Sequence, residues 1–244
     1  MTERGVVRET SAAYADVNGV HMYYEVSGEG DPLLLVHGGF GGVHVFVHQV
    51  ADFAESHRVF VPEMRGRGHT ADVEDPIGYQ LMSDDVVAFL EDRVRAPVNF
   101  VSVSDGGILG LLVALARPDL IRRLVTVGSN FHGDGLLYSS LWMEASADDE
   151  AWAGPREHYG PVSPDGAEHF SVVFAKMQQM WRDGQPQLTV EDLRNIEVPV
   201  LVVAGDDDVI DHGHTIALYE ALPHGQLAVI PGASHGVFME KPDY

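Results

Sequence analysis

The chain has 244 residues, 45% of them hydrophobic, and a formal net charge of −22 from 37 acidic and 15 basic residues. This length fits one large α/β domain or two small ones, and the negative field argues against nucleic acid and anionic membranes as partners. Cysteine is absent, which excludes disulfides, a thiol nucleophile and a thiolate metal site. No segment approaches the ~20 apolar residues of a membrane span, and no signal-peptide run opens the chain, so we expect a cytoplasmic protein.

Apolar strand patterns alternate with helical patterns along most of the chain. The first two strands meet at Asn18-Gly19, a strong hairpin signal. Helical patterns follow at 43–55, 79–94, 108–116 and 215–221. This alternation predicts a mostly parallel sheet covered by helices on both faces. Strands are expected at 14–17, 20–26, 33–36, 58–61, 98–103, 121–127, 198–204 and 226–230.

The alternation of strand and helix patterns is interrupted over residues 130–195. This insert is richer in Trp, Met, His and Asp, and its one persuasive helix runs from Phe170 to Trp181 with apolar residues at helical spacing. Ligands bind at the carboxyl ends of strands in such sheets, so an insert between two strands predicts a cap over a pocket. We divide the chain into a core of residues 1–129 and 196–244 and a helical cap of residues 130–195.

Ser104 lies between the strand 98–103 and the following helix, in the run Ser-Val-Ser-Asp-Gly-Gly. A serine on a sharp strand-to-helix turn with small neighbours is the signature of a nucleophile elbow. In the usual Gly-x-Ser-x-Gly pattern, Ser102 here replaces the first glycine, while Gly106 keeps the second. The alternative is an ordinary turn in which Ser104 caps the helix.

A serine nucleophile needs a base within hydrogen-bond reach and a carboxylate that orients the base. Carboxylate candidates stand in the run Ala-Gly-Asp-Asp-Asp that ends at Asp208, just past a strand. The base candidate is His235, just past the last strand. The order Ser, Asp, His along the chain is that of α/β-hydrolases.

Four landmarks make the chain resemble the α/β-hydrolase fold enzymes. They are His-Gly-Gly after the third strand, Arg-Gly-x-Gly after the fourth, the elbow, and Gly-Asp-x-Asp followed by Gly-x-x-His. The resemblance implies a mostly parallel eight-stranded sheet with helices on both faces and a helical cap. In the family the second aspartate of Gly-Asp-x-Asp is usually catalytic, which implies a triad of Ser104, Asp208 and His235, with Asp206 in reserve.

The same resemblance implies an oxyanion hole built from the main-chain N–H of Asp105 and one from the glycine loop, either Gly39 or Phe40. Ser-Asp-Gly-Gly also resembles the valacyclovir hydrolase (biphenyl hydrolase-like) group, where the aspartate after the nucleophile is associated with the ammonium of amino-acid esters. Local hydrogen bonding at the elbow is the alternative role for Asp105. Substrate contacts are expected from Phe40, Asp105, Phe131, Trp142, Phe174 and Met177.

These residues lead to the hypothesis of a serine hydrolase, carboxylesterase-like (EC 3.1). It would cleave a small to medium, mainly apolar carboxylic ester, a lactone or an activated amide through an acyl-enzyme. We expect no metal and no organic cofactor, because the histidines near the glycine loop and after Asp208 lack a third spaced ligand. Arg65 and Arg67 are interpreted as anchors of their own loop.

Other chemistries share this triad. A carbon–carbon bond hydrolase, an acyltransferase, a hydroxynitrile lyase and a cofactor-free haloperoxidase are alternatives, and a non-catalytic ligand receptor on the same scaffold is another. The expected partner is a small-molecule substrate. The family continues into a final helix where this chain stops at Tyr244, through either a natural short form or truncation. Truncation would expose an apolar flank and favour a homodimer or low stability.

Overall fold

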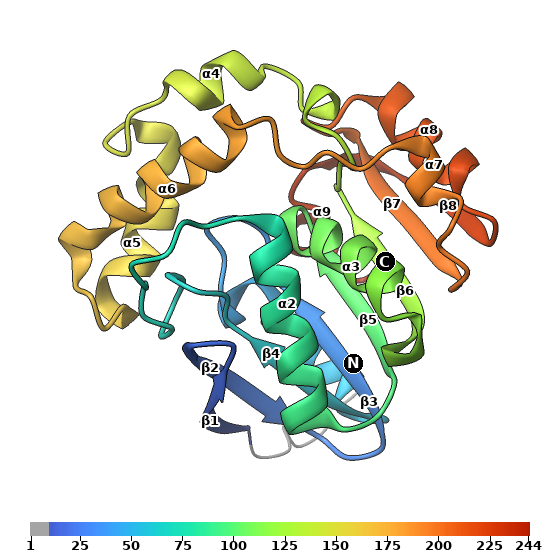
Figure 1. Ribbon diagram of the computed structural model, residues 1–244, viewed down its shortest axis with the longest axis horizontal. Helices are drawn as coiled ribbons and strands as arrows, with labels where there is room; N and C mark the ends of the chain where they lie inside the picture. Colours follow the sequence, from blue (N-terminus) through green and yellow to red (C-terminus); the bar gives the residue numbers. More distant parts are fainter. Residues whose placement is uncertain (1–9) are drawn as a thin grey trace.

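The computed structural model describes residues 10–244 and contains one sheet of eight strands in the order β1-β2-β4-β3-β5-β6-β7-β8 (Figure 1). β1 and β2 form the predicted antiparallel hairpin, β2 pairs antiparallel with β4, and the remaining pairs are parallel. The predicted eight-stranded, mostly parallel sheet is confirmed. The strands are β1 Ser11–Val17, β2 Val20–Ser27, β3 Asp31–Val36, β4 His57–Pro62, β5 Val98–Val103, β6 Ile121–Val127, β7 Val200–Asp207 and β8 Gly225–Ser234.

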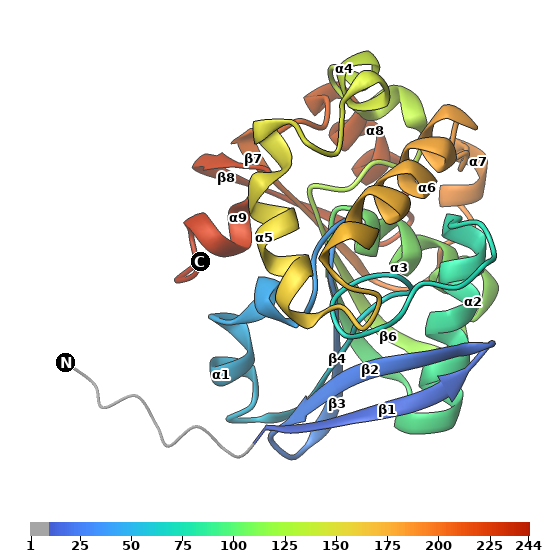
Figure 2. The ribbon, with the colours of Figure 1, turned by 90° about the vertical axis from the view of Figure 1, so that its left-hand side faces the viewer.

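Helices cover both faces of the sheet, and each face has its own apolar core. Successive side chains of a strand point to opposite faces. In β3, Leu34 and Val36 therefore join the core under α2, α3 and α8, while Leu33 and Leu35 join the core under α1 and α9. Figure 2 shows α1 and α9 on one side of the sheet and α2 and α3 on the other. The helices are α1 Gln49–Phe53, α2 Tyr79–Phe89, α3 Asp105–Ala116, α4 Ser139–Glu144, α5 Ala153–Val162, α6 Phe170–Arg182, α7 Val190–Leu193, α8 His212–Ala221 and α9 Val237–Glu240.

Two predicted helices differ in detail from the observed ones. The segment 43–55 contains a 3-10 turn, η1 (Val43–Phe46), and the short α1 rather than one helix. Alternating valines in this segment lose side-chain freedom in a helix, which weakens its continuation. The predicted helix 79–94 has the expected length, but its last five residues form a π-helix, η2 (Leu90–Val94). None of the described helices combines the length and apolarity needed to cross a membrane.

The insert between β6 and β7 forms a cap from α4, α5 and α6 beside the carboxyl ends of the strands (Figure 1). Further one-turn 3-10 helices are η3 (Pro118–Leu120) before β6, and η4 (Gly133–Gly135), η5 (Glu150–Trp152) and η6 (Ala167–His169) in the insert. α7 lies inside the predicted cap range but packs against α3 and α8 of the core. The first residues of the predicted core range lie outside the described residues.

A buried ion pair joins the cap to the core. Lys176 of α6 donates to both carboxylate oxygens of Asp72, at 2.9 and 2.8 Å, and His169 shares Asp72 Oδ2 at 2.9 Å. The Asp72 side chain is 6% exposed, so these contacts replace its hydration. The pair therefore fixes the cap helix α6 over the loop that follows β4.

Candidate active site

Ser104 occupies a strained turn between β5 and α3. Its φ is +53° and its ψ −122°, a conformation that costs a non-glycine residue energy and is typical of functional sites. The Ser104 N–H donates to Val127 O at 2.8 Å, and Ser129 Oγ donates to Ser104 O at 2.9 Å, so neighbouring β6 holds the turn. A Cβ on Gly106 would lie 2.3 Å from Val36 O, which explains why this position needs glycine.

Ser102 replaces the usual first glycine of the elbow without a clash. Its side chain is fully buried, and its Oγ donates to Val125 O on β6 at 2.8 Å. The hydroxyl therefore has a main-chain acceptor, as a buried polar group requires. Ser102 is a structural part of the sheet and does not line the cavity described below.

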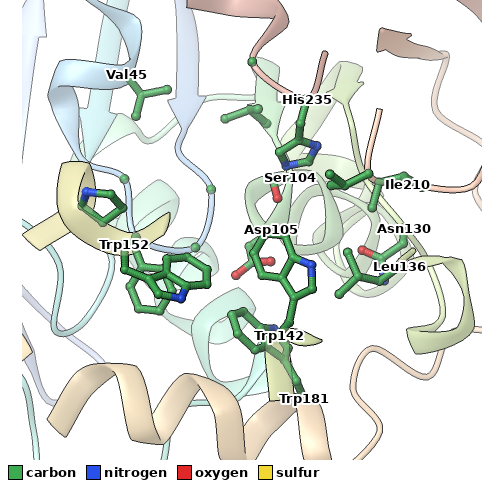
Figure 3. A pocket seen from close by; sticks show the side chains of 18 of the residues that line it. Val45, Ser104, Asp105, Asn130, Leu136, Trp142, Trp152, Trp181, Ile210 and His235 are labelled. Carbon is green, nitrogen blue, oxygen red and sulfur yellow. The ribbon is translucent and has the colours of Figure 1, made fainter. Parts of the chain in front are cut away.

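His235 and Asp208 form the hydrogen bond that a catalytic dyad needs. The Nδ1 of His235 lies 2.7 Å from Asp208 Oδ1, which also accepts from the Ile210 N–H at 3.1 Å. Burial raises the pKa of the Asp208 carboxyl, but the hydrogen bond and charge of His235 outweigh burial and leave it below its ordinary value. Figure 3 shows the side chain of Ser104 next to the imidazole of His235, whose Nε2 is not used by Asp208.

Asp206 and Asp208, at the carboxyl end of β7, have different partners and therefore different roles. A Cβ on Gly128, whose φ is +60°, would lie 2.9 Å from His235 Nδ1 and 3.0 Å from Asp208 Oδ2, so glycine leaves room for the dyad. Asp206 is exposed and accepts from the N–H groups of Gly232 and Ala233, at 2.7 and 3.2 Å. Asp206 thus stabilises the end of β8 around Gly232, and of the two aspartates only Asp208 is hydrogen-bonded to His235.

The glycine loop (Gly38–Gly42) follows β3 and passes beside the nucleophile. His37 is buried beneath it, with Nδ1 donating to Gly38 O at 2.7 Å and Nε2 accepting from the Met64 N–H at 3.0 Å. Burial lowers the pKa of His37 to about 3, so the ring is neutral and structural. A Cβ on Gly38 would lie 2.9 Å from Ser104 Cβ, which places the loop against the elbow.

Asp105 begins α3 and faces a small polar network. Its Oδ1 accepts from the Tyr79 hydroxyl at 2.8 Å, and the Tyr79 oxygen accepts from Trp181 Nε1 at 3.2 Å. Its Oδ2 is buried and has no hydrogen-bond partner among the described residues. Burial raises the pKa of Asp105, while the hydrogen bond from Tyr79 and the charge of Arg67 act against that rise. As the first helical residue, Asp105 also leaves its own N–H without an intrahelical acceptor.

A cavity of about 480 Å³ opens above Ser104 and His235, a size suited to a small molecule. Three of the residues predicted to bind substrate, Phe40, Asp105 and Trp142, line it. The other three do not. Phe131 stacks on His214, Phe174 stacks on Phe40 behind the wall, and Met177 is fully buried under Gly39. The helical spacing of Phe174 and Met177 identified a packed face of α6, and packing between cap and core fills that face.

Other residues that were not predicted to contact substrate also line the cavity. Trp152 and Trp181 complete an aromatic wall with Trp142 (Figure 3), so all three tryptophans of the chain line it. Tyr79 lines it from α2, and His44 and His158 meet with ring centroids 3.9 Å apart. Burial, and then His158, lower the pKa of His44 to about 4. No arginine or lysine lines the cavity, and no cluster of three or more metal-ligating side chains occurs in residues 10–244.

The family model described as "Alpha/beta hydrolase family" matches residues 33–244. The chain belongs to this family. RutD of Agrobacterium fabrum, which carries the name of a carbamate hydrolase, is 27% identical over 91% of this chain and 94% of its own length. The 2-hydroxy-6-oxo-6-(2'-aminophenyl)hexa-2,4-dienoic acid hydrolase of Metapseudomonas resinovorans is 26% identical over 94% of this chain and 86% of its own. The enol-lactonase structure from Burkholderia xenovorans superimposes with a TM-score of 0.76 at 20% identity, over 94% of this chain and 95% of the other. The family and the fold expected from the four landmarks are thus confirmed.

Proposed function

We propose that this α/β-hydrolase is a serine carboxylesterase that cleaves small to medium, uncharged and mainly apolar esters through an acyl-enzyme. The observation that carries the proposal is the His235–Asp208 hydrogen bond of 2.7 Å beside the Ser104 hydroxyl at the base of the cavity. An alcohol of this kind attacks a carbonyl only when a neighbouring base removes its proton.

The reaction follows from the positions of these groups. Ser104 Oγ bonds to the carbonyl carbon while its proton passes to His235, and the carbonyl oxygen takes the negative charge. Asp208 holds the imidazole in the productive tautomer and stabilises its cation. N–H groups of Asp105 and of the glycine loop receive the oxyanion. The carbon–oxygen bond of the ester then breaks, His235 protonates the leaving alcohol, and water releases the acid by the same steps.

The lining of the cavity supports an uncharged substrate. Trp142, Trp152 and Trp181 supply apolar walls, and among residues 10–244 no arginine or lysine lines the cavity to pair with a substrate carboxylate. Asp105 is the one carboxylate that lines the cavity in the part of the chain that the structure describes, and the charge of Arg67 behind it partly balances it. A substrate anion would lose its hydration without a partner, at a cost of several kcal/mol. This favours a neutral ester over both an anionic substrate and an amino-acid ester.

A carbon–carbon bond hydrolase is the second candidate, and the name of the Metapseudomonas resinovorans relative is the observation that favours it. The acid in that name carries a carboxylate, for which the described lining of this cavity offers no arginine or lysine. The carbamate in the name of RutD contains an ester-like carbonyl, and its cleavage fits the same steps. Ligand binding without turnover is a further alternative, and the variants described below separate it from ester hydrolysis.

The test compares matched substrates and matched variants. 4-Nitrophenyl pentanoate and 4-nitrophenyl hemisuccinate have similar length but differ by one carboxylate. We expect the neutral ester to be hydrolysed with at least 10-fold higher kcat/KM, and a 2-hydroxy-6-oxo-dienoate to be cleaved more slowly still. Asp208→Asn should lower kcat by about 10⁴-fold, while Asp206→Asn, in the same turn, keeps it within twofold. Faster cleavage of the dienoate than of either ester would contradict the proposal.

A ligand receptor predicts a different pattern. Such a protein would bind an ester or its acid tightly, without turnover, and Ser104→Ala would leave that binding unchanged. Ester turnover by the wild type that disappears in Ser104→Ala favours the enzyme.

A further inference from the structure

Arg67 is a buried cation that forms no ion pair with a carboxylate in residues 10–244. Arg67 is only 2% exposed. Arg65, two residues earlier, differs: its guanidinium donates two hydrogen bonds to Asp85, at 2.7 and 2.6 Å. An unpaired buried charge is costly, so its retention calls for a role beyond that of the paired arginine.

The Arg67 guanidinium instead donates to three neutral acceptors in three segments. Nε donates to Gly39 O in the glycine loop at 2.8 Å, and Nη1 donates to Arg65 O in its own loop at 2.6 Å. Nη2 donates to Met177 Sδ in the cap helix α6 at 2.7 Å. A thioether is a weak acceptor and none of the three acceptors carries a charge, so these hydrogen bonds give the cation no counter-ion. Arg67 thereby ties the glycine loop to both the core and the cap.

Gly39 lies between this cation and the carboxylate of Asp105. A Cβ on Gly39 would lie 3.2 Å from Asp105 Oδ2 and 3.5 Å from Met177 Cε. Burial lowers the pKa of Arg67, and the charge of Asp105 acts against that shift, so the two groups attract each other without direct contact. The Arg67 guanidinium therefore binds the Gly39 carbonyl on one side, and the Asp105 carboxylate lies close to the Gly39 α-carbon on another side.

The carbonyl directions of the loop determine where its N–H groups point. In a trans peptide the C=O and the following N–H are antiparallel. Gly39 and Phe40 line the cavity, whereas Arg67 does not. The Gly39 carbonyl points toward Arg67, away from the cavity. The Phe40 N–H, on the opposite side of the same peptide, therefore points toward the cavity. The Gly38 carbonyl is held in turn by His37 Nδ1 at 2.7 Å and by the Gly41 N–H at 3.1 Å, which fixes the Gly39 N–H.

We propose that Arg67 is a positioning residue for the transition state: it keeps the Gly39 carbonyl turned away from the reacting carbonyl oxygen and places a positive charge behind the loop that receives the oxyanion. This inference rests on the proposed hydrolase function. A charge fixed in a desolvated site stabilises developing negative charge more strongly than it would in water, and needs no reorganisation during the reaction. Arg67 touches no substrate and acts through Gly39 and Phe40.

The first test replaces the cation by an apolar chain of similar length. Arg67→Met should lower kcat for 4-nitrophenyl pentanoate by roughly 10²-fold, the loss typical of an impaired oxyanion hole. KM should stay within threefold, because the planar ground state makes little use of the hole. Arg67→Lys, which keeps a charge but not the planar fork, should lose about 10-fold. Arg65→Lys is the control in the same loop and should lower the melting temperature while keeping kcat within twofold.

Two further readouts separate positioning from a purely structural role. In Arg67→Ala, millimolar guanidinium chloride should restore kcat at least 10-fold, because the ion can fill the vacated site, while equal potassium chloride should not. A trifluoromethyl ketone forms a tetrahedral adduct with the serine, whereas the matching methyl ketone largely stays planar. Arg67→Met should weaken binding of the first in proportion to kcat/KM and leave binding of the second unchanged.

Several results would overturn the inference. They are an unchanged kcat in Arg67→Met, an effect confined to KM, absence of guanidinium rescue, or equal weakening of both ketones. If Arg67→Met does not fold, Arg67→Lys and the rescue of Arg67→Ala decide the question. Failure of the proposed function itself would look different, because wild-type protein would then hydrolyse no ester and Ser104→Ala would match it.

Discussion

Replacing Ser102 by the glycine usual at this position should destabilise the protein and leave catalysis intact. The Ser102 hydroxyl donates to Val125 O at 2.8 Å in a fully buried site, a hydrogen bond worth about 1 kcal/mol. Glycine within a strand costs about 0.5–1 kcal/mol more through chain entropy. Ser102→Ala should therefore lose about 1 kcal/mol of unfolding free energy, and Ser102→Gly about 2 kcal/mol, summed from the same two effects.

Urea unfolding at 25 °C and ester hydrolysis measure the two consequences separately. The urea midpoint should fall from wild type to alanine to glycine with an unchanged m-value, since the surface exposed on unfolding stays the same. The kcat/KM of each variant should remain within twofold of wild type, because Ser102 does not line the cavity. A glycine variant as stable as wild type, or one that loses activity more than 10-fold, would refute the reasoning.

Three other perturbations test the frame around the site. Gly106→Ala places a Cβ 2.3 Å from Val36 O, a main-chain atom, so it should cost about 1–3 kcal/mol in urea unfolding and abolish ester turnover; wild-type activity would contradict this. His37 has its pKa lowered from 6.5 to about 3, so its stabilising effect is complete above pH 6.5 and is lost as the pH falls toward 3. Between pH 6 and 4 the unfolding free energy of wild type should therefore fall by about 1.4 kcal/mol per pH unit more than that of His37→Gln. Equal pH slopes of the two proteins in urea unfolding would count against this. Lys176→Met leaves the Asp72 carboxylate with His169 and the Val73 N–H as partners and should cost about 1–3 kcal/mol, with faster proteolysis of the cap; an unchanged urea midpoint would disprove the contribution of the Lys176–Asp72 pair.

The sequence predicted the core of this fold because each core element carries its own local signal. The Asn18-Gly19 turn marked the hairpin of the first two strands, apolar runs marked the other six, and the positions where three of those strands end also marked Ser104, Asp208 and His235. Strand length was less predictable. β7 continues to Asp207 through residues of low strand propensity because Asp207 pairs with Ser234 on β8 after an irregularity in the ladder. Pairing between distant segments overrode the local preference.

The cavity wall was harder to predict, because it forms where the cap docks on the core. Trp152 and Trp181 carried no spacing that distinguishes a wall from a packed face, and Phe174 and Met177 carried the same helical spacing but point into packing. α4 and α5 were missed, since α5 contains glycine and proline and has weak intrinsic helix propensity. The role of Arg67 depends on contacts with three segments, and no single stretch of sequence contains them.

The central claim is that Ser104 is a nucleophile activated by His235, and covalent labelling tests it most directly. A fluorophosphonate reacts with an activated serine, and intact mass followed by peptide mapping locates the adduct. We predict one adduct per chain, on Ser104, absent in Ser104→Ala, formed at least 10²-fold more slowly in His235→Gln, and formed at the wild-type rate in Asp206→Asn. No adduct, an adduct on another residue, or a rate unaffected by His235→Gln would contradict the account.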